Sequence, residues 1–168
     1  MNVAASVALA VAERVERTGG PRAGLVAWRT LATTSATESE VRGRAALAAL
    51  RCALALRDEA ALAELVALWE TAHRGVWDAD VATLCREMMR AGLSSHATAL
   101  AQAEVRRHRT ARALYCHARC LDLARDEAAA DVFREAIARA EKEGAADIER
   151  ASRVRRAAIL ARSWHTMS

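Results

Sequence analysis

The sequence predicts an all-α protein, and three observations lead to that prediction. Hydrophobic residues make up 53% of the 168 residues but aromatic residues only 4%, so the core must be built mainly from Ala, Leu and Val. Ala and Leu are strong helix formers. The chain has one proline and seven glycines, and no segment shows the alternation of β-branched or aromatic residues that marks a strand.

Turn signals near the N-terminus separate the first three of nine expected helices. Gly19 and Gly20 end the first helix, and Pro21 opens the second at a first-turn position where its missing N–H costs little. Thr37, with Glu40 three residues later, forms a capping box for the third. These helices are expected at about residues 3–17, 21–34 and 37–56.

The later helices begin at side chains that can accept a hydrogen bond from a first helical turn. Gly92 and Gly144 supply two of the helix ends. The expected starting residues are Asp58, Asp78, Ser94 or Ser95, Thr110 and Asp126. The six helices are expected at about residues 58–74, 78–91, 95–108, 110–124, 126–144 and 146–164, and such short turns make neighbouring helices antiparallel.

The chain repeats part of its own sequence sixty-eight residues apart. The segment Arg-Asp-Glu-Ala-Ala occurs at 57–61 and again at 125–129, and Arg-Cys occurs at 51–52 and at 119–120. Sixty-eight is twice thirty-four, and a third turn, at 92–95, begins thirty-four residues after Asp58. A helix–turn–helix unit of about 34 residues is the period of tetratricopeptide repeats.

Residues 42–144 resemble the tetratricopeptide-repeat family, although its early Trp, its Gly-Tyr pair and its closing proline have no counterpart. The family's second helix carries a small, a large and a small residue in a fixed spacing. Ala129, Phe133 and Ala136 fit this pattern. Ala61 and Leu65 keep its first two places.

The resemblance implies a right-handed α-solenoid in which each helical hairpin buries its apolar face by stacking on its neighbours. It implies one domain over residues 1–168, with hairpins at about 3–34, 37–74, 77–108 and 110–144 and a capping helix at about 146–164. It also implies a concave face that holds a peptide or a partner domain.

On the family's register, a stripe of apolar and acidic residues faces the concave groove and suits an amphipathic helix or an extended peptide with some positive charge. The alternative is that its leucines and methionine form the core between repeats. Trp28, Trp69 and Trp164 are expected to be packing residues or part of an end-to-end contact. The predicted groove residues are Leu50, Leu54, Trp77, Asp80, Leu84, Glu87, Met88, Leu114, Ala118, Leu121 and Asp122.

The C-terminal half is rich in arginine. Such a face can neutralise the phosphates of nucleic acid, but only Tyr115 lies nearby to stack on bases. The alternatives are a solvated helix face and a site for an acidic protein. Arginine makes up all but one of the 25 basic residues, as expected of a GC-rich genome, so the arginines need not have been selected to bind phosphate. The candidate basic surface consists of Arg106, Arg107, Arg109, Arg112, Arg119, Arg150, Arg153, Arg155 and Arg156.

The four cysteines form no framework typical of secreted proteins, so we expect reduced thiols and a cytoplasmic protein. Cys116 and Cys120 lie one helical turn apart on one face. A metal site would need two more ligands, such as Cys52 and Cys85. Because Cys52, Cys85 and Cys120 occupy nearly equivalent repeat positions, we expect them to pack as small hydrophobic residues, with no metal or other cofactor.

No catalytic motif occurs: the sequence lacks a nucleophile elbow, a phosphate-binding glycine loop and a zinc-protease helix. No apolar run approaches the ~18 residues of a membrane span. The sequence therefore predicts a protein that is not an enzyme and acts without a membrane. The resemblance to tetratricopeptide repeats implies that it binds another protein as an adaptor, scaffold or regulatory subunit. The alternatives are a nucleic-acid-associated helical-repeat protein and a sensor or oligomerisation arm of a multidomain regulator.

Overall fold

The computed structural model describes residues 3–34, 38–72, 75 and 77–166. These residues form eight helices and no strand, which confirms the all-α prediction. The chain divides into two compact units, which we call unit 1 (Met1–Val76) and unit 2 (Trp77–Ser168). The single array with a 34-residue period stays a prediction from the sequence.

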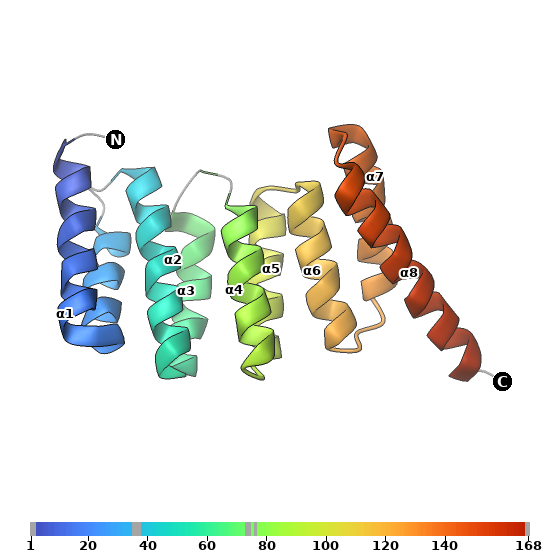
Figure 1. Cartoon of the computed structure of the whole chain (residues 1–168), viewed down its shortest axis with the longest axis horizontal. Coiled ribbons are helices and arrows are strands. Elements are labelled where there is room, and N and C mark those ends of the chain that lie inside the picture. Colours follow the sequence, from blue (N-terminus) through green and yellow to red (C-terminus); the bar gives the residue numbers. More distant parts are fainter. Residues whose placement is uncertain (1–2, 35–37, 73–74, 76, 167–168) are drawn as a thin grey trace. The chain divides into compact units, whose positions relative to one another are not determined.

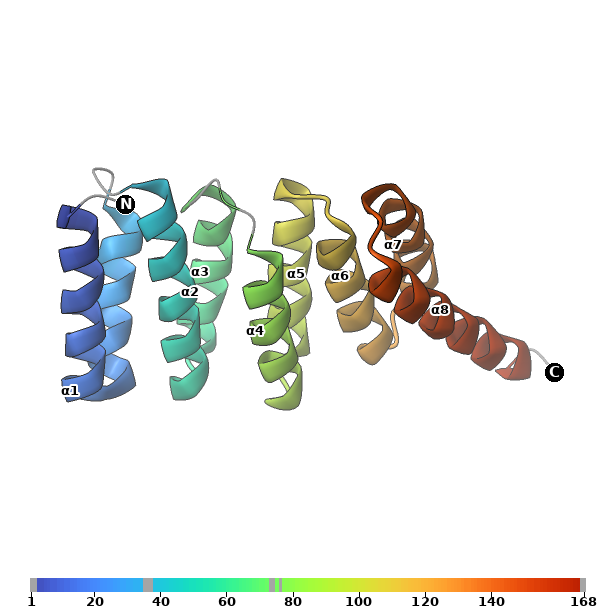
Figure 2. The same ribbon diagram turned by 45° about the horizontal axis from the view of Figure 1, so that its top comes forward.

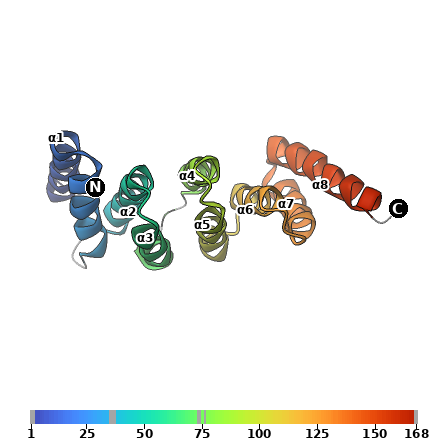
Figure 3. The same ribbon diagram turned by 90° about the horizontal axis from the view of Figure 1, so that it is seen from below.

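Unit 1 contains α1 (Val3–Thr33), α2 (Ser39–Leu56) and α3 (Glu59–Ala72). The first element, α1, has a kink at Gly20, whose φ of 73° and ψ of −172° are not helical, and Pro21 follows directly. The predicted break is therefore confirmed. Because α1 contains the first two expected helices, the described residues form eight helices and not the nine that were expected. The two segments of α1 lie side by side (Figures 1 and 3).

The two segments of α1 are joined by a side-chain contact and a close approach. The Trp28 indole Nε1 donates a 2.6 Å hydrogen bond to Glu16 Oε2. A Cβ atom on Gly24 would lie only 2.8 Å from Glu16 Cγ and 3.1 Å from Cys52 Sγ. Glycine at position 24 therefore lets the second segment approach both the first segment and α2.

The core of unit 1 forms where α2 packs against both α1 and α3. Trp28 and Trp69 are buried, as expected of packing residues, and Leu62 and Leu65 of α3 are buried with them. The side chain of Trp164 lies outside the described residues.

Unit 2 contains α4 (Asp78–Arg90), α5 (Ser94–Arg107), α6 (Ala111–Leu123), α7 (Ala129–Glu143) and α8 (Ala146–Thr166). Each helix packs on the next, and α6 also contacts α4 and α8 (Figure 2). Phe133 of α7 is fully buried and meets the ring of Tyr115 edge-on, with ring centroids 5.9 Å apart. The central helix, α6, therefore touches all four of the other helices of its unit.

Several predicted caps are confirmed. Asp58 Oδ1 accepts a 3.0 Å hydrogen bond from the backbone N–H of Ala61, and Thr110 Oγ1 accepts one of 3.1 Å from Ala113. Gly92 and Gly144 have positive φ values of 82° and 70° at the ends of α4 and α7. These residues act through local backbone groups, which is why a sequence pattern can find them.

Three predicted starts differ from the structure, and a fourth lies outside it. Asp78 is the first residue of α4, and Trp77 occupies the N-cap. Ser94 is the first residue of α5, and Leu93 occupies the N-cap without a side-chain hydrogen bond. Asp126 accepts a 2.8 Å hydrogen bond from the N–H of Ala128, so its carboxylate stabilises a turn, and α7 begins only at Ala129. The proposed cap Thr37 lies outside the described residues.

Within the described ranges, none of the helices combines the length and the apolar character needed to cross a lipid bilayer.

Candidate functional site

Most apolar residues of the predicted groove lie in the core. Leu84 and Met88 of α4 and Leu114 and Ala118 of α6 have at most 3% of their surface exposed. These four side chains therefore lie in the core of unit 2 and do not line an open groove. The core alternative therefore describes these residues, and it also describes Leu50 of unit 1, which is fully buried.

The remaining groove residues differ in their exposure. Leu54 belongs to unit 1, while Trp77 is half-buried, and Asp80 and Glu87 of α4 are exposed. Leu121 and Asp122 are buried. The Asp122 carboxylate accepts a 2.6 Å hydrogen bond from Arg162 Nη2 of α8, so it holds a helix of its own unit.

The nine arginines of the candidate basic surface fall into different environments. Arg109 pairs with Glu135, and Arg153 pairs with Glu141 and Glu149 at 2.6 and 2.9 Å. These two charges are neutralised within the unit. Of the others, Arg107, Arg119 and Arg156 are half-buried, whereas Arg106, Arg112, Arg150 and Arg155 are exposed.

Helices α4, α6 and α8 of unit 2 surround a cavity of about 440 Å³. Part of its lining is apolar, with Met89 from α4, Leu123 from α6 and Ile148 from α8. No sequence pattern indicates this cavity, because the cavity depends on how three helices are spaced. Its volume falls in the range of cavities that bind small ligands or single side chains of a partner.

Three arginines, against one aspartate (Asp147), line the cavity and give it a positive potential. Arg86 and Arg112 are exposed, and neither forms an ion pair with a carboxylate in the described part of the chain. Arg119 is half-buried, and its Nη1 donates to Tyr115 Oη at 3.4 Å, while its buried Nε has no partner there. These guanidinium groups therefore have donors left for a carboxylate or a phosphate.

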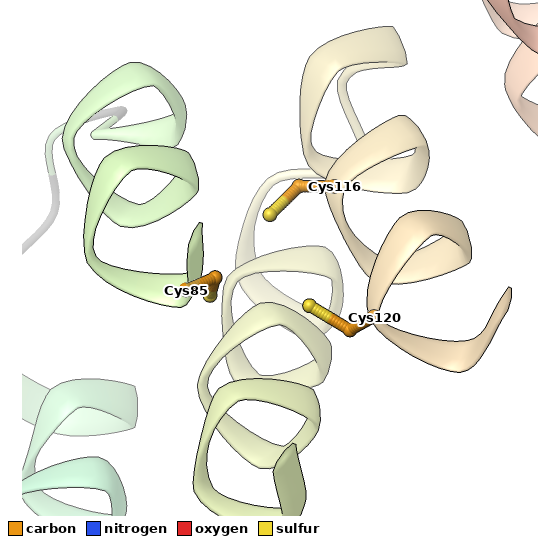
Figure 4. A group of neighbouring side chains, drawn as sticks. All are labelled: Cys85, Cys116 and Cys120. Atoms are coloured by element: carbon orange, nitrogen blue, oxygen red, sulfur yellow. The ribbon is translucent and has the colours of Figure 1, made fainter. Parts of the chain in front are cut away.

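Three cysteines also line the cavity. Cys85 extends from α4, and Cys116 and Cys120 extend from α6, so that their Sγ atoms lie within 4.8 Å of one another (Figure 4). All three side chains are buried. The Cys85 thiol donates a 3.3 Å hydrogen bond to the carbonyl oxygen of Ala97 in α5, which fixes its orientation.

The three thiols differ in acidity because they hydrogen-bond to one another. The hydrogen bond with Cys116 lowers the pKa of Cys120 below its usual value, and the nearby His117 and Arg119 act in the same direction. The hydrogen bond to Cys120, together with burial, raises the pKa of Cys116. The hydrogen bond with Cys116 likewise raises the pKa of Cys85. Cys120 is therefore the thiol of the group whose pKa is lowered, and the deprotonated form of a thiol is the one that binds metals.

Cys52 is not part of this group, although the sequence pattern predicts a repeat position for it nearly equivalent to those of Cys85 and Cys120. It lies in α2 of unit 1, where burial and the adjacent Glu16 raise its pKa to about 11. A residue of positive φ follows each of the three helices and gives a common point for comparing positions. Cys52 lies five residues before Arg57, and Cys120 lies five residues before Arg125. Cys85, however, lies seven residues before Gly92. Two residues rotate a side chain about 200° around a helix, so Cys85 is not in the equivalent position.

Comparisons with protein-family models, with curated proteins and with solved structures found no match for this chain. The resemblance to tetratricopeptide repeats therefore stays a prediction from the sequence.

Proposed function

We propose that the protein is an interaction module, and that the cavity of unit 2 binds an acidic segment of a partner protein. The observation that carries this proposal is the lining of the cavity, where Arg86, Arg112 and Arg119 surround an apolar interior. Arginine binds carboxylates in a two-pronged geometry that lysine cannot form. A partner segment with an apolar side chain between Asp or Glu residues matches this lining.

The size of the cavity favours a few side chains of a peptide. A volume of about 440 Å³ accommodates an apolar side chain in contact with Met89, Leu123 and Ile148. The arginines around it would then pair with the carboxylates that flank that side chain. This arrangement uses the cavity as the binding site in place of the stripe that the sequence predicted, because most apolar residues of that stripe are buried.

A nucleic acid is the less favoured ligand for the same half of the chain. Arg109 and Arg153 are already paired with carboxylates of their own unit, which weakens their attraction for phosphates. Tyr115, the one aromatic residue of the lining, contacts Phe133 and Arg119. It is therefore not available as a stacking platform for bases.

A displayed library of random peptides, selected against the full chain, tests the proposal. We expect enriched peptides that carry an apolar residue between acidic ones. The double variant Arg86→Glu/Arg112→Glu should weaken their binding by about tenfold or more, because each reversal replaces an attraction by a repulsion. Arg150→Glu/Arg155→Glu makes the same change in charge at exposed arginines of α8 outside the cavity lining, and it should leave the affinity within about twofold.

Two outcomes would contradict the proposal. One is a selection that yields no acidic motif, and the other is an equal loss of affinity in both double variants, which would indicate attraction by overall charge. Labelled single-stranded and duplex oligonucleotides, titrated at increasing salt, form a parallel arm. Tight binding there that falls steeply with salt and is lost in both variants would favour the nucleic-acid alternative.

A further inference from the structure

Three thiols from two helices converge on one point in unit 2. The Sγ atoms of Cys85, Cys116 and Cys120 lie within 4.8 Å of one another. Zinc–thiolate bonds of about 2.3 Å in tetrahedral geometry place sulfur atoms about 3.8 Å apart. The sulfur atoms therefore need to approach one another by at most about 1 Å, which small side-chain rotations supply.

The geometry points to a zinc site formed by Cys85, Cys116 and Cys120, with its fourth coordination position open to the cavity of unit 2. Among the described residues, no histidine, carboxylate or further cysteine joins this group. The cavity touches all three cysteines, so it supplies both the entry path and room for a water molecule as the fourth ligand. Three protein ligands with one exchangeable position form a known zinc arrangement.

Packing alone accounts less well for this arrangement. A buried cysteine commonly acts as a small hydrophobic residue, and Cys52 in unit 1 is such a case, because no second thiol lies near it in the described structure. The other three come from α4 and α6, and their sulfur atoms lie within 4.8 Å of one another (Figure 4).

The charge of the complex favours a divalent ion over cuprous ion. Three thiolates and Zn²⁺ carry one net negative charge, whereas three thiolates and Cu⁺ carry two. The site is buried, and burying charge is costly unless it is compensated. Arg86 and Arg119 line the same cavity and can balance the single negative charge of the zinc complex.

Zinc binding at this site is coupled to proton release. Each thiol that becomes a ligand loses its proton to solvent as its sulfur–zinc bond forms, and no electron is transferred. The affinity should therefore fall as the pH is lowered, as it does at other thiolate sites. Cobalt(II) can replace zinc as a coloured probe, because its absorption reports tetrahedral geometry and bonds to sulfur.

The test uses the full chain, kept reduced by a phosphine under argon and titrated with Co²⁺ and then with Zn²⁺. We expect one ion per chain, a sulfur-to-cobalt charge-transfer band, and loss of that band when zinc displaces cobalt. Cys116→Ser and Cys120→Ser should each lower zinc affinity at least about 100-fold, since even second-shell changes cost 10- to 100-fold. Cys52→Ser is the matched control, because it removes a buried thiol outside the group, and it should bind zinc like the unchanged chain.

The proposal would be overturned by the absence of saturable one-to-one binding, by equal affinities of the Cys52→Ser and Cys120→Ser variants, or by binding of cuprous ion without zinc. Should a cysteine variant fail to fold, the unchanged chain still decides the question. The intensity of its charge-transfer band must then correspond to three thiolates, and zinc must raise its melting temperature. Because no peptide is present in this experiment, its failure leaves the proposed binding of an acidic partner untouched.

Discussion

Arg57 and Arg125 lie sixty-eight residues apart and end their helices in the same way. Both have left-handed backbone conformations, with φ values of 53° and 60°. The N–H of Arg57 donates to the Leu54 carbonyl at 3.0 Å, and that of Arg125 donates to the Asp122 carbonyl at 3.1 Å. The N–H of the following aspartate donates in each case to the carbonyl five residues before it. The repeated sequence therefore encodes a repeated turn.

A third turn of the same form ends α4. Gly92 has a φ of 82°, and its N–H donates to the Met89 carbonyl at 3.1 Å, while that of Leu93 donates to the Met88 carbonyl at 2.9 Å. Gly92 follows Arg57 by thirty-five residues and precedes Arg125 by thirty-three. Two of the three turns thus place an arginine where glycine is the favoured residue.

Substituting glycine at either arginine turn should stabilise the protein. A left-handed conformation costs a non-glycine residue about 1–2 kcal/mol, and glycine loses about 0.5–1 kcal/mol through its greater freedom in the unfolded chain. Arg57→Gly and Arg125→Gly should therefore each raise the free energy of unfolding by about 0.5–1 kcal/mol. Urea denaturation measures this. Gly92→Ala, where an added Cβ would meet no atom within 4 Å, should lower stability by a similar amount. A loss of stability in both arginine variants would contradict the explanation.

The features that the sequence predicted correctly are local. The kink at Gly20, the cap at Thr110 and the helix end at Gly144 depend on a residue and on backbone groups within a few positions of it. Asp126 shows the limit of such patterns, because its carboxylate can accept from a turn as well as from a helix, and here Ala128 in the turn is the donor. Local chemistry allowed both outcomes.

The candidate site could not be predicted, because it depends on how helices are spaced and rotated. An apolar stripe such as that of Leu84 and Met88 suits a partner's helix and a neighbouring helix equally well, and the burial of both side chains within unit 2 decides between them. The sequence did place Cys116 and Cys120 on one helical face. It could not show that Cys85, and not Cys52, completes the group, since that depends on the rotation of α4 toward α6.

A substitution at Gly24 tests whether the two segments of α1 approach each other and α2 closely. Gly24→Ala should lower the free energy of unfolding by about 1 kcal/mol, because overpacking outweighs the gain in helix propensity. The added Cβ would lie 2.8 Å from Glu16 Cγ, and the Glu16 side chain is held by Trp28. In a Glu16→Ala background the same substitution should cost less, and a double-mutant cycle by urea denaturation measures the difference. Equal costs in both backgrounds would show that the Glu16 Cγ is not the obstacle, since alanine keeps the Cβ atom that lies 2.9 Å from the added atom.

The ion pair between Arg162 of α8 and Asp122 of α6 is expected to hold these two helices of unit 2 together, and removal of Arg162 tests this. The Asp122 side chain is only 7% exposed, whereas that of Arg162 is 48% exposed. Arg162→Ala leaves a buried carboxylate without its partner, and we expect a loss of about 1–2 kcal/mol, below the value for fully buried pairs because Arg162 is partly solvated. Amide hydrogen exchange should accelerate in α8. Arg155→Ala, at an exposed arginine of the same helix, is the control, and an equal effect there would exclude the ion pair as the cause.

Cys52 makes the stability of unit 1 sensitive to high pH. Burial and Glu16 raise its pKa from 9.0 to about 11 in the folded chain, so the folded state favours the neutral thiol. Its contribution is fully present below pH 9 and is lost as the pH rises toward 11, because the unfolded chain then loses this proton first. Two pKa units correspond to at most about 2.7 kcal/mol.

We expect Cys52→Ala to be about 1 kcal/mol less stable than the unchanged chain at pH 8, because its smaller side chain leaves a small cavity. The difference should shrink or reverse by pH 11. Urea denaturation of both chains across this range measures it, and a difference that stays constant would show that Cys52 ionises alike in the folded and unfolded states.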